Sequence, residues 1–317
     1  MSIRIAYFGT GHLAVPAFLS LLDSQHRIVG LVTQPDRVGR GHHQHVNPLK
    51  VAAVERGLAV LQPESIKSPE AVESLRQMSA DLFVVAAYGQ ILSPDVLAVP
   101  PLGTINIHAS LLPRYRGATP IHAAILNGDD ETGVTIIQIE PKMDAGPMLG
   151  VVRTPIQSTE TTGELEERLS QLAVPLVLRV IDEIEAGVAT PIAQDPALVT
   201  RVRKLSKPDG RIDWSRSAVE VERHVRGMQP WPGPFTELHQ LERPAHRIQV
   251  QAVRVISCDP FAAGRPGDVL SVDPNEITVC CGDQAVQILK LQPDGKRPMS
   301  AAEFLRGHKL VPGDRFE

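Results

Sequence analysis

Cysteine is scarce in this chain of 317 residues, which holds only Cys258, Cys280 and Cys281. The three show neither the spacing of a disulfide framework nor that of a zinc site, so the sequence disfavours both kinds of structural staple. No metal is expected elsewhere either. A reducing compartment agrees best with this composition.

Long apolar runs are also missing. No stretch reaches the roughly 20 residues that a membrane-spanning helix needs, and Met1 leads directly into an apolar segment without a basic leader or a cleavage site. We therefore expect a soluble, cytoplasmic, monomeric protein that has no membrane partner.

An excess of positive charge is absent too, since the formal net charge is -4. This disfavours a general nucleic-acid binder, but the charge is unevenly placed. Residues 1–200 hold 14 Lys and Arg against 21 Asp and Glu, whereas residues 201–317 hold 18 against 15. Basic residues gather where the second part begins, and they form either a solvated linker surface or a track for phosphates: Arg201, Arg203, Lys204, Lys207, Arg211 and Arg216.

Strand and helix patterns alternate through the first part. Strands are predicted over 3–8, 28–32, 58–61, 81–87, 102–105, 134–139 and 148–152, and helices over 15–22, 49–56, 69–78, 120–126 and from 161 onward. Thr161 to Glu164 has the pattern of a helix-capping box. Such alternation predicts an α/β fold, a Rossmann-like parallel sheet that binds ligands at the carboxyl edge of its strands.

The segment Gly9 to Ala14 matches the Gly-x-Gly-x-x-Ala form of the dinucleotide fingerprint. The acidic residue that would hold a ribose is not at the tip of the second strand, because Asp36 follows a proline in a turn. The glycines also suit a tight turn from strand to helix. A nicotinamide-dependent oxidoreductase is therefore the alternative from another enzyme class.

Residues 34–48 are rich in Gly, Arg, His and Pro, a composition that cannot form a packed element, so we predict a loop at the strand-end side of the sheet. His42, His43 and His45 lie close together, but no carboxylate or thiolate stands at ligand spacing from them.

Asn106 and His108 follow a short buried strand, and their spacing of two points both side chains to the same face. A neutral donor beside an imidazole is the combination that holds and protonates an oxyanion in acyl-type transfer. Asp144 lies in a turn between two later strands. A structural histidine and a structural turn residue are the simpler interpretations of the same pattern.

The string Asn106 to Gly117, followed by Gly128 to Thr135 and Met143 to Pro147, resembles the formyltransferases that use 10-formyltetrahydrofolate, and most of all those acting on methionyl-tRNA. The resemblance implies transfer of the formyl group to the amino group of initiator methionyl-tRNA, for translation initiation. A sugar-nucleotide amine formyltransferase and a formyl-folate hydrolase with the same core are the alternatives.

The resemblance also implies roles for single residues. Asn106, His108 and Asp144 would be catalytic, with Asp144 raising the pKa of His108 and keeping it protonated. Arg40 would lie in the loop that reaches the acceptor end of tRNA, where histidines replace the lysines expected after it, so the charge of the loop should depend on pH. The folate-binding residues would be Tyr88, Gly89, Gln90, Ile91, Leu92, Ser110, Leu111, Leu112 and Pro113, and further tRNA-binding residues would be Arg203, Lys204 and Lys207.

The second part has a different pattern. Residues 190–206 have little apolar periodicity and indicate a linker between a catalytic domain, 1–189, and a C-terminal domain, 207–317. A helix near 218–226 and short strand patterns at 247–256, 268–271, 277–281 and 285–291 predict a small barrel. By resemblance it is an OB-like barrel that binds tRNA; a purely structural cap is the alternative.

Overall fold

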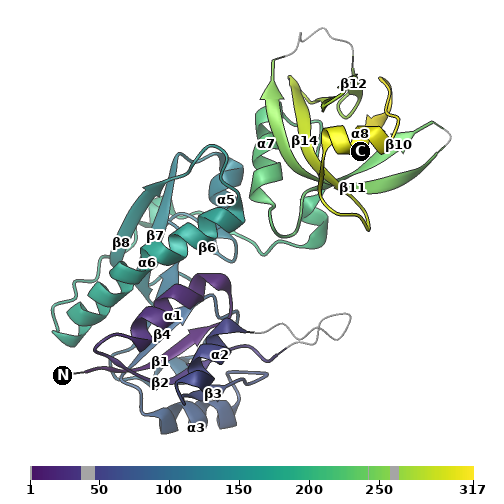
Figure 1. Cartoon of the computed structure of the whole chain (residues 1–317). Helices are drawn as coiled ribbons and strands as arrows, with labels where there is room; N and C mark the ends of the chain where they lie inside the picture. The colour runs from purple at the N-terminus through teal and green to yellow at the C-terminus, as the bar shows by residue number, and fades with distance from the viewer. Residues whose placement is uncertain (1, 37–46, 242, 258–263) are drawn as a thin grey trace. The chain divides into compact units, whose positions relative to one another are not determined.

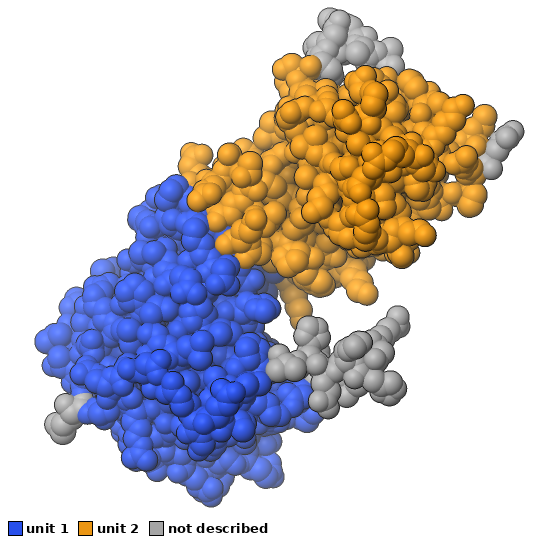
Figure 2. Space-filling view, in the orientation of Figure 1, with its two compact units in different colours: residues 1–120, 131–155, 165–202 blue, residues 121–130, 156–164, 203–317 orange. Residues whose placement is uncertain are grey.

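A computed structural model of the protein describes residues 2–36, 47–241, 243–257 and 264–317. The chain forms two compact units (Figure 2). Unit 1 comprises residues 1–120, 131–155 and 165–202, and unit 2 comprises residues 121–130, 156–164 and 203–317. The chain thus passes into unit 2 after Val202, within the predicted linker 190–206, whose exact limits stay a prediction.

Unit 1 is built on a seven-stranded sheet with the order β3-β2-β1-β4-β5-β7-β8. Its first five strands are parallel, whereas β7 and β8 run antiparallel to their neighbours. The predicted Rossmann-like sheet is confirmed, with an antiparallel hairpin added at one edge. The strands are β1 (Arg4–Gly9), β2 (Arg27–Val32), β3 (Ala59–Leu61), β4 (Leu82–Ala86), β5 (Thr104–His108), β7 (Glu131–Gln138) and β8 (Met148–Pro155).

Helices cover both faces of this sheet (Figure 1). On one face, Phe8 and Phe83 pack with Leu75 of α3 in a buried apolar cluster. On the other face Tyr7 lies against Phe18 of α1, with ring centroids 5.1 Å apart. The helices are α1 (Val15–Leu22), α2 (Pro48–Glu55), α3 (Pro69–Met78), α4 (Pro94–Leu97), α5 (Pro120–Asn127) and α6 (Thr162–Glu185).

The long helix α6 begins at the predicted capping box. The backbone N–H of Thr161 donates to the Glu164 carboxylate at 2.9 Å, and the Glu164 N–H donates back to the Thr161 hydroxyl at 3.4 Å. Further along, α6 approaches β8 so closely that a Cβ on Gly150 would lie 2.9 Å from Leu176. The helix therefore packs directly on the antiparallel edge of the sheet.

Gly9 serves close packing. A Cβ at this position would lie 2.8 Å from the Ala14 side chain and 3.2 Å from the carbonyl oxygen of Ala86. The chain then enters a 3-10 turn, His12–Ala14, before α1. These contacts explain why residue 9 of the apparent dinucleotide fingerprint is a glycine, and the explanation does not require a bound nucleotide.

The predicted linker contains regular structure. Strand β9 (Arg201–Val202) pairs in parallel with β6 (Arg116–Gly117), and an isolated bridge joins Ile192 to Met148. This part of the chain thus returns to the sheet of unit 1. The 3-10 turns η2 (Pro196–Leu198) and η3 (Lys207–Gly210) lie before and after β9.

Unit 2 contains an antiparallel sheet with the order β12-β13-β14-β11-β10-β16. Its ends meet, because the Val269 N–H donates to the Asp314 carbonyl and the Phe316 N–H donates to the Gly267 carbonyl, both at 2.8 Å. Hydrogen bonding at both edges closes the predicted OB-like barrel. Its strands are β10 (Phe235–Gln240), β11 (Arg243–Ile256), β12 (Val269–Asp273), β13 (Glu276–Cys280), β14 (Ala285–Pro293), β15 (Met299–Ser300) and β16 (Arg315–Phe316).

The barrel encloses one apolar core. The helix α7 (Ala218–Gly227) contributes Val221 and Val225, and α8 (Ala301–Gly307) contributes Phe304. The sequence patterns predicted α7 but missed α8, β10 and the closing strand β16. In the part of the chain that the structure describes, no helix is long and apolar enough to cross a membrane.

Candidate active site

Asn106 and His108 lie within β5, between the parallel strand β4 and the antiparallel strand β7. Asn106 is in register with Val85 and Ile137, and His108 with Thr135. The predicted strand was two residues too early, but the spacing of two still points both side chains to one face. Within the described chain, no hydrogen bond or ion pair engages the Asn106 carboxamide.

The ring of His108 has a defined proton arrangement. Its Nε2 lies 3.0 Å from the carbonyl oxygen of Tyr115, which can only accept, so Nε2 carries a hydrogen. Its Nδ1 lies 3.8 Å from Oδ2 of Asp144, too far for a direct hydrogen bond. A second proton on the ring would therefore sit on Nδ1, beside the carboxylate.

The expected raised pKa of His108 is wrong. Burial lowers the pKa of His108 below its ordinary value, although the Asp144 charge and the hydrogen bond to Tyr115 oppose this effect. His108 is only 5% exposed and Asp144 makes no direct bond to it, so desolvation outweighs attraction. The resting imidazole is consequently neutral near pH 7.

Asp144 lies in the β7–β8 connection with a left-handed backbone, φ 50°. Aspartate tolerates this conformation better than most residues. The backbone N–H of Gly117 donates to Oδ2 of Asp144 at 2.8 Å. Backbone geometry and this bond together aim the carboxylate at His108, so the structure brings the imidazole and the carboxylate together as the sequence predicted.

Thr135 anchors the loop of the predicted folate-binding residues Ser110, Leu111, Leu112 and Pro113. Its hydroxyl donates to the Ser110 carbonyl at 2.7 Å and accepts from the Leu112 N–H at 3.2 Å. Sequence reasoning missed this residue, because a threonine in a strand has no distinguishing pattern.

The second predicted folate segment, Tyr88 to Leu92, leaves the end of β4. Burial raises the pKa of Tyr88 to about 12, and its ring meets Phe8 edge-on at 5.4 Å. The Gln90 side chain accepts from the Ile66 N–H at 2.9 Å. Gly89 and Ile91 are exposed whereas Leu92 is buried. The side chains of Tyr88, Gln90 and Leu92 thus anchor the segment, and Gly89 and Ile91 face solvent.

The predicted tRNA-binding residues differ in their surroundings. Arg203 is held by Asp209, with one nitrogen 3.0 Å from the carboxylate, and this pairing lowers the pKa of Asp209. Lys204 and Lys207 make no ion pair in the ranges that the structure describes. Arg40 and the neighbouring histidines lie outside the described residues. Of the described three, the two lysines are thus better available to a phosphate.

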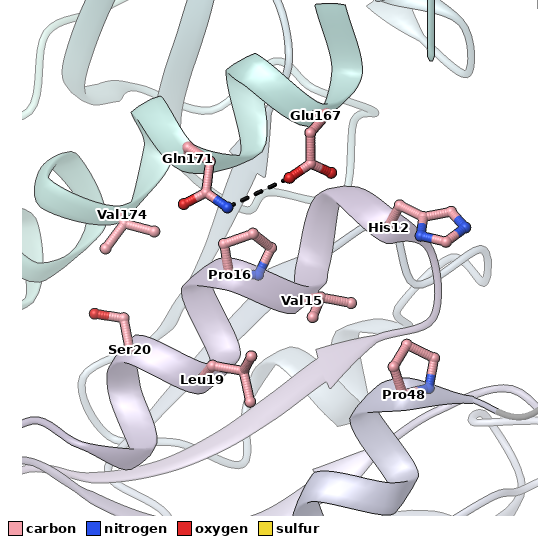
Figure 3. A pocket seen from close by; sticks show the side chains of 9 residues that line it. All are labelled: His12, Val15, Pro16, Leu19, Ser20, Pro48, Glu167, Gln171 and Val174. Atoms are coloured by element: carbon pink, nitrogen blue, oxygen red, sulfur yellow. Dashed lines mark hydrogen bonds between the residues drawn. The ribbon is translucent and has the colours of Figure 1, made fainter. Parts of the chain in front are cut away.

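A cavity of about 530 Å³ lies elsewhere in unit 1. Figure 3 shows it between α1 and α6, with His12, Pro16 and Gln171 among its lining residues. None of the predicted site residues that the structure describes lines it. We assign it no part in the chemistry.

Three potential metal ligands, His26, Asp182 and Glu185, offer atoms within 4.8 Å of one another. Oδ1 of Asp182 lies 3.1 Å from His26 Nε2 and accepts from Gln25 at 2.8 Å. These bonds explain the cluster as an anchor between the β2 entrance and α6, and we assign no metal to it.

Two family models match this chain. The one described as formyl transferase matches residues 2–181, and the one described as formyl transferase, C-terminal domain, matches residues 204–309. The chain belongs to the formyltransferase family.

Curated relatives of this formyltransferase match over nearly their full lengths. The chain is 42% identical to the methionyl-tRNA formyltransferase of Akkermansia muciniphila over 316 residues, which cover 99% of this chain and 100% of the relative. It is 44% identical to the methionyl-tRNA formyltransferase of Roseiflexus castenholzii, over 100% of this chain and 99% of the relative.

Solved structures share the fold of this formyltransferase at low identity. HypX from Aquifex aeolicus, in complex with tetrahydrofolic acid, has a TM-score of 0.63 at 18% identity, over 100% of this chain and 51% of HypX. The sugar 3N-formyltransferase WlaRD has a TM-score of 0.66 at 16% identity, over 94% of this chain and 100% of WlaRD.

Proposed function

We propose that this formyltransferase transfers the formyl group of 10-formyltetrahydrofolate to the amino group of initiator methionyl-tRNA, the reaction that prepares this tRNA for translation initiation. The observation that carries the proposal is the arrangement of His108 Nδ1 at 3.8 Å from Asp144 Oδ2, on the strand that also presents Asn106. Full-length relatives at 41–44% identity bear the name methionyl-tRNA formyltransferase, which supports this choice of acceptor.

The reaction begins when the amine nitrogen attacks the formyl carbon and the carbonyl oxygen becomes an oxyanion. The Asn106 carboxamide donates a hydrogen bond to this oxygen. Removing one such donor from an oxyanion site typically costs about 10²–10³ in rate.

The proton follows a separate path. Nδ1 of the neutral His108 ring accepts the proton that the attacking amine releases, and the Asp144 carboxylate stabilises the imidazolium that results. His108 then delivers this proton to N10 of the folate as the bond from carbon to N10 breaks. The ring returns to its neutral state, and no metal ion is needed to balance the step.

The folate is proposed to lie along the segments Tyr88 to Leu92 and Ser110 to Pro113, which both adjoin the strand ends at the site. Lys204 and Lys207 would contact tRNA phosphates, together with Arg203 and Arg40. We place this reaction in the cytoplasm, because the cysteine-poor composition suits a reducing compartment. We also infer that the enzyme acts as a monomer.

One competition assay tests the proposal. The purified protein is given 10-formyltetrahydrofolate with charged initiator tRNA, with an amino-sugar nucleotide, or with water alone, and the labelled formyl group is traced. We expect it on methionyl-tRNA. Transfer to the sugar or release as formate would overturn the proposal in favour of the two alternative activities.

A further inference from the structure

Gln194 has an unusually complete set of hydrogen bonds. Its Nε2 donates to the carbonyl oxygen of Asp144 at 2.8 Å and to that of Gly146 at 2.7 Å. Its Oε1 accepts from Nε of Arg116 at 3.0 Å and from a terminal guanidinium nitrogen at 2.8 Å. A carboxamide has two N–H donors and one oxygen with two lone pairs, so every bonding position of Gln194 is used.

The bonds of Gln194 reach the turn that carries Asp144. Asp144 has a left-handed backbone, and a Cβ on Gly146 would lie only 1.8 Å from the Gln138 carbonyl oxygen, so the turn is tight. The bridge between Ile192 and Met148 brings residues 192–194 alongside β8. Gln194 thereby holds the turn from the side of the segment predicted to be only a linker.

Gln194 also bonds to Arg116, the neighbour of the residue whose backbone N–H holds the Asp144 carboxylate. Arg116 precedes Gly117, whose N–H donates to Asp144 Oδ2. Arg116 is buried, and in the described chain it forms no ion pair with a carboxylate within 4.0 Å. A neutral carboxamide therefore accepts two of the five N–H groups of the guanidinium, and among the described residues Arg116 forms no ion pair with the Asp144 carboxylate that faces His108. A hydrogen bond from the guanidinium also strengthens the bonds that the carboxamide donates.

We propose that Gln194 is a positioning residue of the formyl-transfer site, which holds the Asp144 carboxylate at the Nδ1 side of His108. This inference rests on the proposed function for its effect on rate. Its effect on the charge state of His108 follows from the geometry alone. A displaced carboxylate would stabilise the imidazolium less, and a displacement near 1 Å can cost about 10² in rate.

Two variants and one control test the proposal. Gln194→Met keeps the length of the side chain but loses all four bonds. Gln194→Glu keeps the acceptor for Arg116 but loses both donors, and it turns one carboxylate oxygen toward two carbonyl oxygens. Gln171→Met is the control, because Gln171 is exposed on α6 and its side chain makes a single hydrogen bond to the described residues, donated to Glu167 at 3.4 Å.

We expect both Gln194 variants to lose about 10² in kcat, with KM for the folate changed less than about threefold. The pKa of His108, followed by NMR of the ring nitrogens in the folded protein, should fall in Gln194→Met toward its value in Asp144→Asn. Gln171→Met should match the parent in both measurements.

Three results would overturn the inference. The first is a parent-like kcat in either Gln194 variant. The second is a reduced kcat in Gln194→Met with the pKa of His108 unchanged. The third is a change of kcat and of the His108 pKa in Gln171→Met as large as that in Gln194→Met. Failure of the proposed function looks different, because the parent protein itself would then transfer the formyl group to the amino-sugar nucleotide or release it as formate. The NMR comparison of Gln194→Met with Asp144→Asn decides the positioning role in that case too.

Discussion

Two opposing effects determine the charge of His108. Desolvation lowers its pKa, while the Asp144 carboxylate and the Tyr115 carbonyl act in the other direction. Because Tyr115 occupies Nε2, protons can enter and leave only at Nδ1. This combination suits an imidazole that must be neutral before the reaction and cationic during it, which a permanently charged ring could not do.

At the residue scale we predict the acid limb of the pH profile. His108 must be neutral to accept a proton, so kcat should stay constant near neutrality and fall with acidification below pH 6.5, the ordinary pKa of histidine. Asp144→Asn removes the stabilising charge, so it should cost about 10² to 10⁴ in kcat and move this limb to lower pH. Steady-state kinetics from pH 4.5 to about 8 measure both effects.

The same shift affects folding. The unfolded chain binds a proton at His108 more readily than the folded chain does, so this residue reduces stability as the pH falls below 6.5. The contribution of His108 to the stability of the folded protein is fully present at pH values above the pKa that this residue has in the unfolded chain. Denaturation of the parent and His108→Gln at several pH values checks the sign, and a parent that gains stability relative to the variant on acidification contradicts the account.

At the scale of elements, the antiparallel pair β7 and β8 distinguishes this sheet from a purely parallel one. Its connection carries Asp144, and β7 itself carries Thr135, which holds the loop after β5. The candidate site at β5 is therefore held in place by β7 and by the β7–β8 connection, which come later in the sequence. In unit 2 the equivalent late element is β16, which completes the barrel.

We predict that Phe316→Ala destabilises unit 2 by about 3–5 kcal/mol, because the ring is 1% exposed and its loss leaves a cavity next to Trp214. Leu241→Ala is the matched control, since that side chain is 90% exposed and its removal should change stability by less than about 0.5 kcal/mol. Chemical denaturation followed by the fluorescence of the two tryptophans, Trp214 and Trp231, measures both. Equal stabilities would refute the closing role of β16.

For the molecule as a whole, the two substrates differ in their need for basic residues. The sequence is acidic overall, yet Lys204 and Lys207 lie near the start of the last segment of unit 2, residues 203–317, without ion pairs in the described chain. A small folate needs few cations, whereas a tRNA offers a phosphate at every nucleotide. The basic segment should therefore matter for one substrate and not for the other.

We expect the double variant Lys204→Ala and Lys207→Ala to raise KM for tRNA and leave KM for the folate unchanged. Each lost phosphate contact should lower the slope of log affinity against log salt by about 0.7–0.9, so loss of both should lower it by about 1.4–1.8. Arg76→Ala, which removes an exposed arginine of α3 paired with Glu73, is the control. An unchanged salt slope would exclude the phosphate track.

Sequence reasoning went furthest where a pattern is local. The apolar runs of β1 and β4, the capping box of α6 and the spacing of Asn106 and His108 all depend on neighbours along the chain, and the structure has each of them. It went least far with β16 and α8, which have little pattern of their own and owe their conformation to partners distant in the chain. Arg40 lies outside the described residues, and its role stays a prediction.

The amino-acid sequence alone determined the α/β class, the family resemblance and the residue types at the site, because periodicity and short motifs record them directly. Only the tertiary structure showed the burial of His108 and the four hydrogen bonds of Gln194. Burial and hydrogen bonding are properties of groups brought together from distant segments, and the free energy of a charge depends on those surroundings.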